Sequence, residues 1–330
     1  METVYFGERT FQLPRSVVTI GNFDGIHVGH QEILRRGRDV SKARGIPLVV
    51  ISFKPHPGKV LYPQKAPEII KTDRQKRELL RQQGVDYYFV IRFSPEFSRM
   101  EPEKFLNILL VESLGAEYVL VGAGFAFGRK RSGNVEVIEK FGATHGIRVD
   151  PVPHVMLDGE VVSSSSIRSL LKNGKIRKAN RFLGRYYYME GIVIHGEQLG
   201  RKLGFPTANI ISENELTPLL GVYASCTNVG GKRYGSVTNI GLKPTFGGKK
   251  IIVETHIFNF DMDIYGEEIT VAFVEFIRPE VKFDSVEKLV DEIRNDCELA
   301  METLDREEKS GRINEMAVVP IKSNRHNGKN

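Results

Sequence analysis

The sequence predicts an α/β domain with a doubly wound parallel sheet, followed by an antiparallel β-barrel domain with a C-terminal helix. Three observations carry this prediction. In the first half, short apolar runs alternate with helical patterns, which is typical of a parallel sheet. From about residue 184, strand-like segments follow one another with turn residues and no helix between them, which indicates a closed barrel. The length of 330 residues also exceeds what one core usually fills, about 250 residues.

The first domain, expected over residues 1–183, begins with a strand, a turn and a helix. Val17–Ile20 is an apolar β-branched run that Gly21 ends, and helical spacing starts at about Val28 and stops at Gly45. The pattern continues with predicted strands at 48–53, 87–91 and 118–121. Predicted helices cover 72–83, with Thr72 and Gln75 as a capping box, and the stretch from Pro102 to Gly115.

The second domain is expected over residues 184–310. Its predicted strands are 186–194, 221–229, 233–240, 251–260 and 268–277. A final helix is predicted over 285–303, with Asp284 and Glu287 as a capping box. The polar and basic tail, 311–330, is expected to be disordered.

The composition is that of an ordinary soluble globular protein, with 41% hydrophobic and 27% charged residues. No apolar run approaches the roughly 20 residues of a membrane span, and the N-terminus lacks a signal-peptide core, so we expect a cytoplasmic protein without a membrane partner. A net charge of +6, with basic and acidic residues interleaved, favours small anionic ligands over nucleic acid. Cys226 and Cys297 are expected to be buried small hydrophobic residues.

The strand–turn–helix unit points to phosphate binding. Its turn delivers Asn22, Asp24, His27 and His30 to the start of a helix, where free N–H groups and the helix dipole favour anions. Two imidazoles at HxGH spacing can donate to the oxygens of a polyphosphate, and Gly29 lets the backbone come close.

The string GNFDGIHVGH resembles the signature of the HxGH nucleotidylyltransferases, which have a Rossmann-like fold. In this wording it resembles bacterial bifunctional riboflavin kinase/FAD synthetases. The resemblance extends to the FxPHP-type motif at His56 and to the stretch SSSSIR, in which Ser166 replaces a frequent Arg. It implies catalytic roles for His27, His30 and Arg168. The ATP site that it implies for this domain comprises Gly21, Asn22, Asp24, His27, His30, His56, Ser164 and Arg168.

The stretch VGAGFAFGRKRSG, residues 121–133, does not have the glycine spacing of a GxGxxG dinucleotide motif. In the family that it resembles, this region reads VGxDFxFG and lines the nucleotide and flavin site, which implies a flavin-binding role for Phe127. The chain departs from that pattern at Gly124, where an acidic residue is usual, and at Ala126, where Arg is frequent.

In the second domain, GRKLGFPTAN, residues 200–209, combines glycines that free the backbone with neutral oxygens suited to Mg²⁺. It resembles the GFPTAN motif of riboflavin kinases, as does NIGLKPTFGG, residues 239–248. The resemblance implies Mg²⁺ ligation by Thr207 and Asn209. The kinase ATP site that it implies comprises Gly200, Gly204, Pro206, Thr207 and Asn209.

Glu254 is the one carboxylate in the run IIVETHIFNF, and it points either to solvent or inward to a site. The resemblance matches it to the kinase's catalytic base, with His256 as a supporting residue. The resemblance also places Arg278 near the flavin, while a surface charge is its other reading.

The resemblance therefore implies that the barrel phosphorylates riboflavin to FMN with MgATP, and that the α/β domain adenylylates FMN to FAD. Two alternatives stay open. The first domain could be inactive or act on another phosphorylated acceptor, which leaves a riboflavin kinase alone. The chain could instead be a flavin-sensing or RNA-binding regulator. Self-association is also left open.

Overall fold

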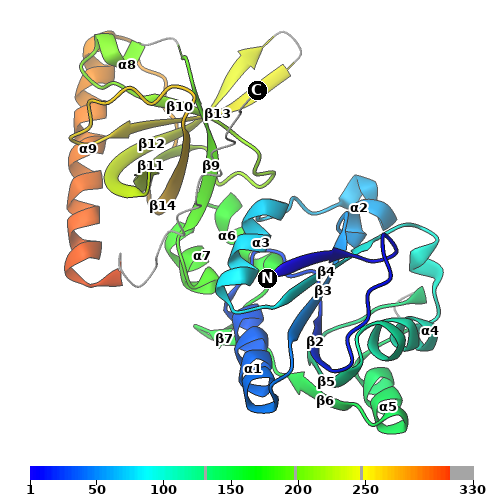
Figure 1. The fold of residues 1–330 in the computed structure, drawn as a ribbon. Helices are drawn as coiled ribbons and strands as arrows, with labels where there is room; N and C mark the ends of the chain where they lie inside the picture. The colour runs from blue at the N-terminus through cyan, green and yellow to red at the C-terminus, as the bar shows by residue number, and fades with distance from the viewer. Residues whose placement is uncertain (130–131, 197–198, 246–247, 313–330) are drawn as a thin grey trace, which may run out of the picture. The chain divides into compact units, whose positions relative to one another are not determined.

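The computed structural model describes residues 1–129, 132–196, 199–245 and 248–312 (Figure 1). By packing, the chain divides between Ser164 and Ser165 into two compact units. The boundary expected from the sequence, at 183/184, lies further along the chain. The tail was predicted to be disordered from residue 311. Its residues 313–330 lie outside the described residues.

The first unit is built on a parallel sheet with the strand order β1-β4-β3-β2-β5-β6. The order turns back between β2 and β5, because the chain winds from β2 through β3 to β4 on one side and continues with β5 and β6 on the other. The doubly wound α/β prediction is therefore confirmed. The strands are β1 (Glu2–Tyr5), β2 (Ser16–Ile20), β3 (Leu48–Lys54), β4 (Tyr87–Arg92), β5 (Ala116–Gly122) and β6 (Arg148–Val152).

The two edge strands of this sheet, β1 and β6, were absent from the prediction. β1 is four residues long, and β6 contains Pro151, a residue that sheets accept chiefly at an edge. The four central strands all contain buried apolar runs, and β2 is buried at every position. Edge strands bury less surface and so leave a weaker hydrophobic pattern.

The helices of the first unit begin and end largely where local signals predict. Gly45 closes α1 in the left-handed region, with φ 64°. Thr72 and Gln75 form the predicted capping box of α3, with reciprocal bonds of 3.2 and 3.1 Å. The helices are α1 (Val28–Arg44), α2 (Pro57–Leu61), α3 (Asp73–Gln82), α4 (Pro102–Leu106), which continues as a π-helical segment (Asn107–Ser113), and α5 (Val135–His145). A small hairpin, β7 (Met156–Leu157) and β8 (Glu160–Val161), precedes Ser164.

The second unit is a closed antiparallel barrel with the strand order β10-β13-β12-β11-β14-β9 (Figure 1). The barrel prediction is confirmed, but the sequence indicated five of these strands and missed β10, which begins within the GFPTAN motif. β10 pairs with both β9 and β13 and so closes the barrel. The strands are β9 (Tyr187–Ile194), β10 (Ala208–Ser212), β11 (Gly221–Val229), β12 (Lys232–Thr245), β13 (Gly248–Ile257) and β14 (Glu268–Arg278).

The long helix α9 (Val286–Lys309) packs along the barrel wall (Figure 1). The prediction of Asp284 as its cap was wrong: Ser285 is the N-cap, and its hydroxyl accepts a hydrogen bond from the Lys288 N–H at 3.2 Å. The serine hydroxyl satisfies a free N–H of the first helical turn, as the Asp284 carboxylate had been expected to do.

Two further helices, α6 (Ser164–Lys172) and α7 (Ile176–Leu183), precede the barrel. The Asn180 amide on α7 donates to the Phe273 carbonyl at 2.9 Å and accepts from the Tyr187 N–H at 2.7 Å. The Leu219 N–H donates to the Leu171 carbonyl at 2.9 Å. These contacts explain why the division by packing falls at the first residue of α6 rather than after α7.

Both cysteines are buried and free, as predicted. Burial raises the pKa of each thiol, Cys226 and Cys297, to about 11. Within the described ranges, no helix combines the length and apolar character that crossing a membrane requires.

Candidate functional site

The two histidines of the HxGH turn lie against each other at the start of α1. His27 is the N-cap residue in an extended conformation, and its ring stacks on that of His30 with 3.7 Å between centroids and 22° between planes. A Cβ added at Gly29 would lie 3.2 Å from His27 Cε1 and Nδ1. A side chain at position 29 would therefore press on the His27 ring, although the helical backbone there does not itself need glycine.

The turn before these histidines is conformationally unusual. Phe23 and Ile26 have φ angles of 47° and 40°, which cost a non-glycine residue roughly 1 to 3 kcal/mol. Buried contacts hold the turn in this state. The Asp24 carboxylate accepts the Ile70 N–H at 3.0 and 3.2 Å, and the Ser164 hydroxyl donates to the Asp24 carbonyl at 2.8 Å. Asp24 and Ser164, both predicted ATP ligands, thus also shape the turn.

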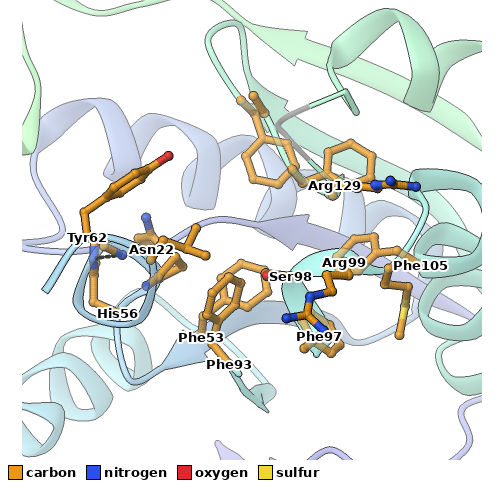
Figure 2. Close-up of a pocket in the computed structure, with 18 of the residues that line it drawn as sticks. Asn22, Phe53, His56, Tyr62, Phe93, Phe97, Ser98, Arg99, Phe105 and Arg129 are labelled. Atoms are coloured by element: carbon orange, nitrogen blue, oxygen red, sulfur yellow. Dashed lines mark hydrogen bonds between the residues drawn. The ribbon is translucent and has the colours of Figure 1, made fainter. Parts of the chain in front are cut away.

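A cavity of about 900 Å³ lies at the carboxyl ends of β2, β3, β4 and β5 (Figure 2). It contains three of the predicted site residues: Asn22 after β2, His56 after β3 and Phe127 after β5. Figure 2 shows Asn22 and His56 at one end, beside Tyr62. The carboxyl edge at the point where the strand order reverses is the usual ligand position in such sheets.

His56 has a defined role in local structure. It is the N-cap of α2, and its Nδ1 accepts a hydrogen bond from the Gly58 N–H at 3.1 Å. This bond fixes the tautomer with the proton on Nε2, because Nδ1 must offer a lone pair.

Most of the cavity wall was not predicted from the sequence. Phe53 and Phe93 lie between its two ends, and Arg99 and Arg129 lie at the end opposite Asn22 (Figure 2). The available signal was the position of Phe53 and Phe93, each near the carboxyl end of a predicted strand. The aromatic residues of the lining are Phe53, Tyr62, Phe93, Phe97, Phe105, Phe125 and Phe127.

Gly124, which departs from the family pattern, also lines this cavity. A Cβ at this position would lie 3.2 Å from His154 Cε1. Gly21 precedes the turn, and a Cβ there would lie 3.2 Å from the Phe23 ring. Arg168 lies on α6, beyond the division between the units, so its position relative to the histidines stays a prediction.

In the second unit, the GRKLGFPTAN stretch folds into the short helix α8 (Leu199–Lys202) and a tight turn. Gly204 has a φ of 89°, and a Cβ at Gly200 would collide with the Phe205 carbonyl oxygen. His256 Nδ1 bonds the Pro206 carbonyl at 2.8 Å. This contact is compatible with the supporting role expected for His256, which itself stays a prediction.

Glu254 lies between two asparagines, opposite Asn209 on β10 and Asn239 on β12. Its neighbours Val253 and Thr255 are buried on the opposite face of β13. Glu254 therefore points neither to open solvent nor into the barrel interior. It lines a cavity of about 270 Å³ on the outer wall, together with Thr207 and Arg278.

Arg278 is tied to helix α9. Its Nε donates to Asp296 Oδ1 at 2.8 Å, its Nη2 donates to Asp296 Oδ2 at 2.6 Å, and its Nε lies 3.1 Å from Glu292 Oε1. The side chains of Arg278 and Asp296 are 17% and 5% exposed, so neither belongs to the open surface. Burial raises the pKa of Asp296, and the Arg278 guanidinium opposes that rise. Asp296 was not singled out in the sequence, because its partner lies 18 residues away on a different element.

A second cavity of this unit, of about 450 Å³, lies beside the first. It is lined by Arg201, Tyr265, Asp261 and Asp263, among others. Thr207 lines both cavities. The GFPTAN turn therefore adjoins two spaces, one of which contains Glu254.

The oxygen groups of the GFPTAN turn suit a metal ion that binds together with a nucleotide. Across the described residues, no group of three or more His, Cys, Asp or Glu side chains is placed to hold a metal ion. Thr207 and Asn209 offer neutral oxygens, and Mg²⁺ is usually bound by few protein ligands together with substrate phosphates.

Comparison with known proteins gives a family match for each half of the chain. A family model described as FAD synthetase matches residues 10–166, and one described as riboflavin kinase matches residues 183–304. The bifunctional riboflavin kinase/FMN adenylyltransferase of Buchnera aphidicola is 36% identical over 290 residues, which are 86% of this chain and 92% of the relative. The chain belongs to this family. The resemblance inferred from the two motifs is thereby confirmed.

Other bifunctional riboflavin kinase/FMN adenylyltransferases match over the same extent. The protein of Haemophilus influenzae is 36% identical over 284 residues, which are 86% of this chain and 92% of the relative. A crystal structure described as a macrolide-efflux protein from Streptococcus pneumoniae has a TM-score of 0.84 and 29% identity, and covers 91% of this chain and 98% of that one.

Proposed function

We propose that this chain makes FAD from riboflavin in two ATP-dependent steps, one in each unit. The observation that carries the proposal is that in each unit residues of the family motifs line a cavity of suitable chemistry. Asn22 and His56 lie at one end of an aromatic cavity in the first unit. Glu254 and Thr207 share a cavity in the second unit. Aromatic walls suit the flat ring system of a flavin.

In the barrel, Glu254 is the general base for phosphorylation of riboflavin. Its carboxylate accepts the proton of the ribityl 5′-hydroxyl as that oxygen attacks the γ-phosphorus of ATP, and ADP leaves. Because Thr207 borders both cavities, we assign the larger one to ATP and the one containing Glu254 to riboflavin. Arg278, fixed by Asp296, holds the flavin side of this cavity.

In the first unit, a phosphate oxygen of FMN attacks the α-phosphorus of ATP, and pyrophosphate leaves. No covalent enzyme intermediate is needed, so the residues act by position and charge. His27, His30 and Arg168 offset the charge on the leaving pyrophosphate, and the N–H groups at the start of α1 add to this field. Phe127 and the other aromatic residues hold the flavin ring.

Mg²⁺ is the metal that these steps require. When bound with ATP it offsets phosphate charge, and Thr207 and Asn209 are the residues that would hold it in the barrel.

The test is chromatography of flavins after the purified chain has been incubated with riboflavin and MgATP, and separately with FMN and MgATP. FAD in both mixtures supports the proposal. EDTA, which removes Mg²⁺, should abolish FAD formation in both. FMN from the first mixture and no FAD from the second would leave a riboflavin kinase alone. No turnover in either mixture, with salt-sensitive RNA binding, would favour a regulator.

A further inference from the structure

A buried cation lies behind the turn that leads to the HxGH histidines. Lys76 on α3 is 9% exposed, and its ammonium donates to the Asn22 carbonyl at 2.8 Å. Burial lowers the pKa of Lys76, while the charges of Asp24 and Asp73 oppose this effect and Lys54 adds to it. An ammonium is costly to remove from water. Because the hydrogen bond of Lys76 goes to a neutral carbonyl and not to a carboxylate, ion pairing alone does not explain why this side chain is buried.

The Asn22 carbonyl is one of several groups that hold the strained turn. The Ser52 hydroxyl also donates to it, at 3.1 Å. Further along the turn, the Asp24 carboxylate and carbonyl are held as described above, and the Gln31 amide donates to the Ile26 carbonyl at 2.9 Å. Among these named contacts, Lys76 provides the charged donor. Hydrogen bonds from charged groups contribute about twice as much as those between neutral groups.

The bond to Lys76 acts on a residue whose side chain faces the cavity. Asn22 lines the 900 Å³ cavity beside His56, and five residues later the same backbone reaches the N-cap His27. A shift of the Asn22 backbone would therefore move both a cavity-lining amide and the first turn of α1.

From this geometry we propose that Lys76 is a positioning residue for adenylyl transfer: through the Asn22 carbonyl it holds the turn that places Asn22 and His27. Lys76 is not among the residues that line the cavity, so it would act through Asn22. The inference rests on the proposed function of the first unit, and it adds a residue of α3 to that site.

The experiment compares Lys76→Met, which removes the charge and the donor at similar volume, with Lys76→Arg, which keeps a cation with N–H donors. Arg77→Met is the matched control, because Arg77 is the next residue of α3 and its side chain is 39% exposed. For each variant, kcat and KM are measured for FAD formation from FMN and MgATP. Riboflavin phosphorylation by the same chain and thermal unfolding serve as measures of folding.

Lys76→Met is expected to lower kcat for FAD formation by about 10²-fold, the usual effect of a displaced catalytic group. The KM for FMN should change less than threefold, and riboflavin phosphorylation should stay at the wild-type rate. Lys76→Arg should recover at least tenfold of the loss, and Arg77→Met should stay within twofold of wild type.

Wild-type kcat in Lys76→Met, or an equal loss in Lys76→Arg and Lys76→Met, would overturn the positioning role. A loss of kcat that is matched by lost thermal stability and lost FMN binding would show a structural role and overturn it as well. If the wild-type chain forms FMN but no FAD, the proposed function of the first unit fails, and this inference fails with it.

Discussion

Glu254 on β13 lies directly opposite Asn209 on β10 in the wall of the barrel. The pairing connects the carboxylate to the GFPTAN stretch through one strand, although the two motifs are far apart along the chain. It is the geometric basis for assigning both residues to the same phosphoryl-transfer site.

The first prediction concerns that carboxylate. Glu254→Gln should lower kcat for riboflavin phosphorylation by roughly 10²- to 10⁴-fold, the usual contribution of a general base, because the amide cannot accept the hydroxyl proton. FAD formation from added FMN should be unchanged. Glu267→Gln, at an exposed position before β14, is the control. An unchanged rate of FMN formation in Glu254→Gln would refute the base assignment.

The second prediction concerns the stacked imidazoles. His30→Ala should lower FAD formation from FMN by about 10²-fold or more, because a donor to the leaving pyrophosphate is lost. Riboflavin phosphorylation should be retained. His145→Ala, on α5 away from the turn, is the control. Equal loss of both activities in His30→Ala would indicate misfolding rather than a catalytic role.

Gly29 offers a test of ring position without loss of a histidine. In Gly29→Ala the new Cβ would press on the His27 ring, at 3.2 Å from two of its atoms. FAD formation should fall at least tenfold, while the free energy of unfolding should change by less than about 1 kcal/mol, since alanine favours a helix. Kinetics and urea denaturation measure the two quantities. Full activity would show that the histidine stack does not need its observed geometry.

Asp296→Asn should weaken riboflavin binding in the barrel. Arg278 would lose a charged, two-bond partner (2.8 and 2.6 Å), which should lower the free energy of unfolding by about 2 to 3 kcal/mol. The KM for riboflavin should rise several-fold more than the KM for ATP. Asp291→Asn, whose side chain is 71% exposed, is the control. An unchanged KM for riboflavin would contradict the proposal that Arg278 contacts the flavin.

The last prediction concerns the cysteines. Because the pKa of both thiols is about 11, the thiolate fraction at pH 8 is small, and alkylation by iodoacetamide should be roughly 10²- to 10³-fold slower than in the unfolded chain. Mass spectrometry of the native protein and of the protein in urea measures this ratio. A thiol labelled equally fast in both would contradict the burial described above.

Local signals in the sequence were enough for the central elements. Buried β-branched runs identified β2 and β3, and the Thr72–Gln75 capping box identified the start of α3, because each depends on residues close together in the chain. The edge strands β1 and β6 were missed because an edge strand buries less surface. The short strand β10 was missed because its five residues carry little pattern of their own, and its pairing with β9 and β13 is a tertiary contact.

The sequence by itself determined the two-domain architecture, the family and the motif residues, because hydrophobic periodicity, caps and motif spacing are properties of short segments. The tertiary structure decided which of those residues meet. The order of the parallel strands brings Asn22, His56 and Phe127 to one cavity. Closure of the barrel turns Glu254 onto the outer wall, and packing of α9 brings Asp296 to Arg278. These contacts join residues far apart along the chain, so sheet order, barrel closure and helix packing had to be known before they could be assigned.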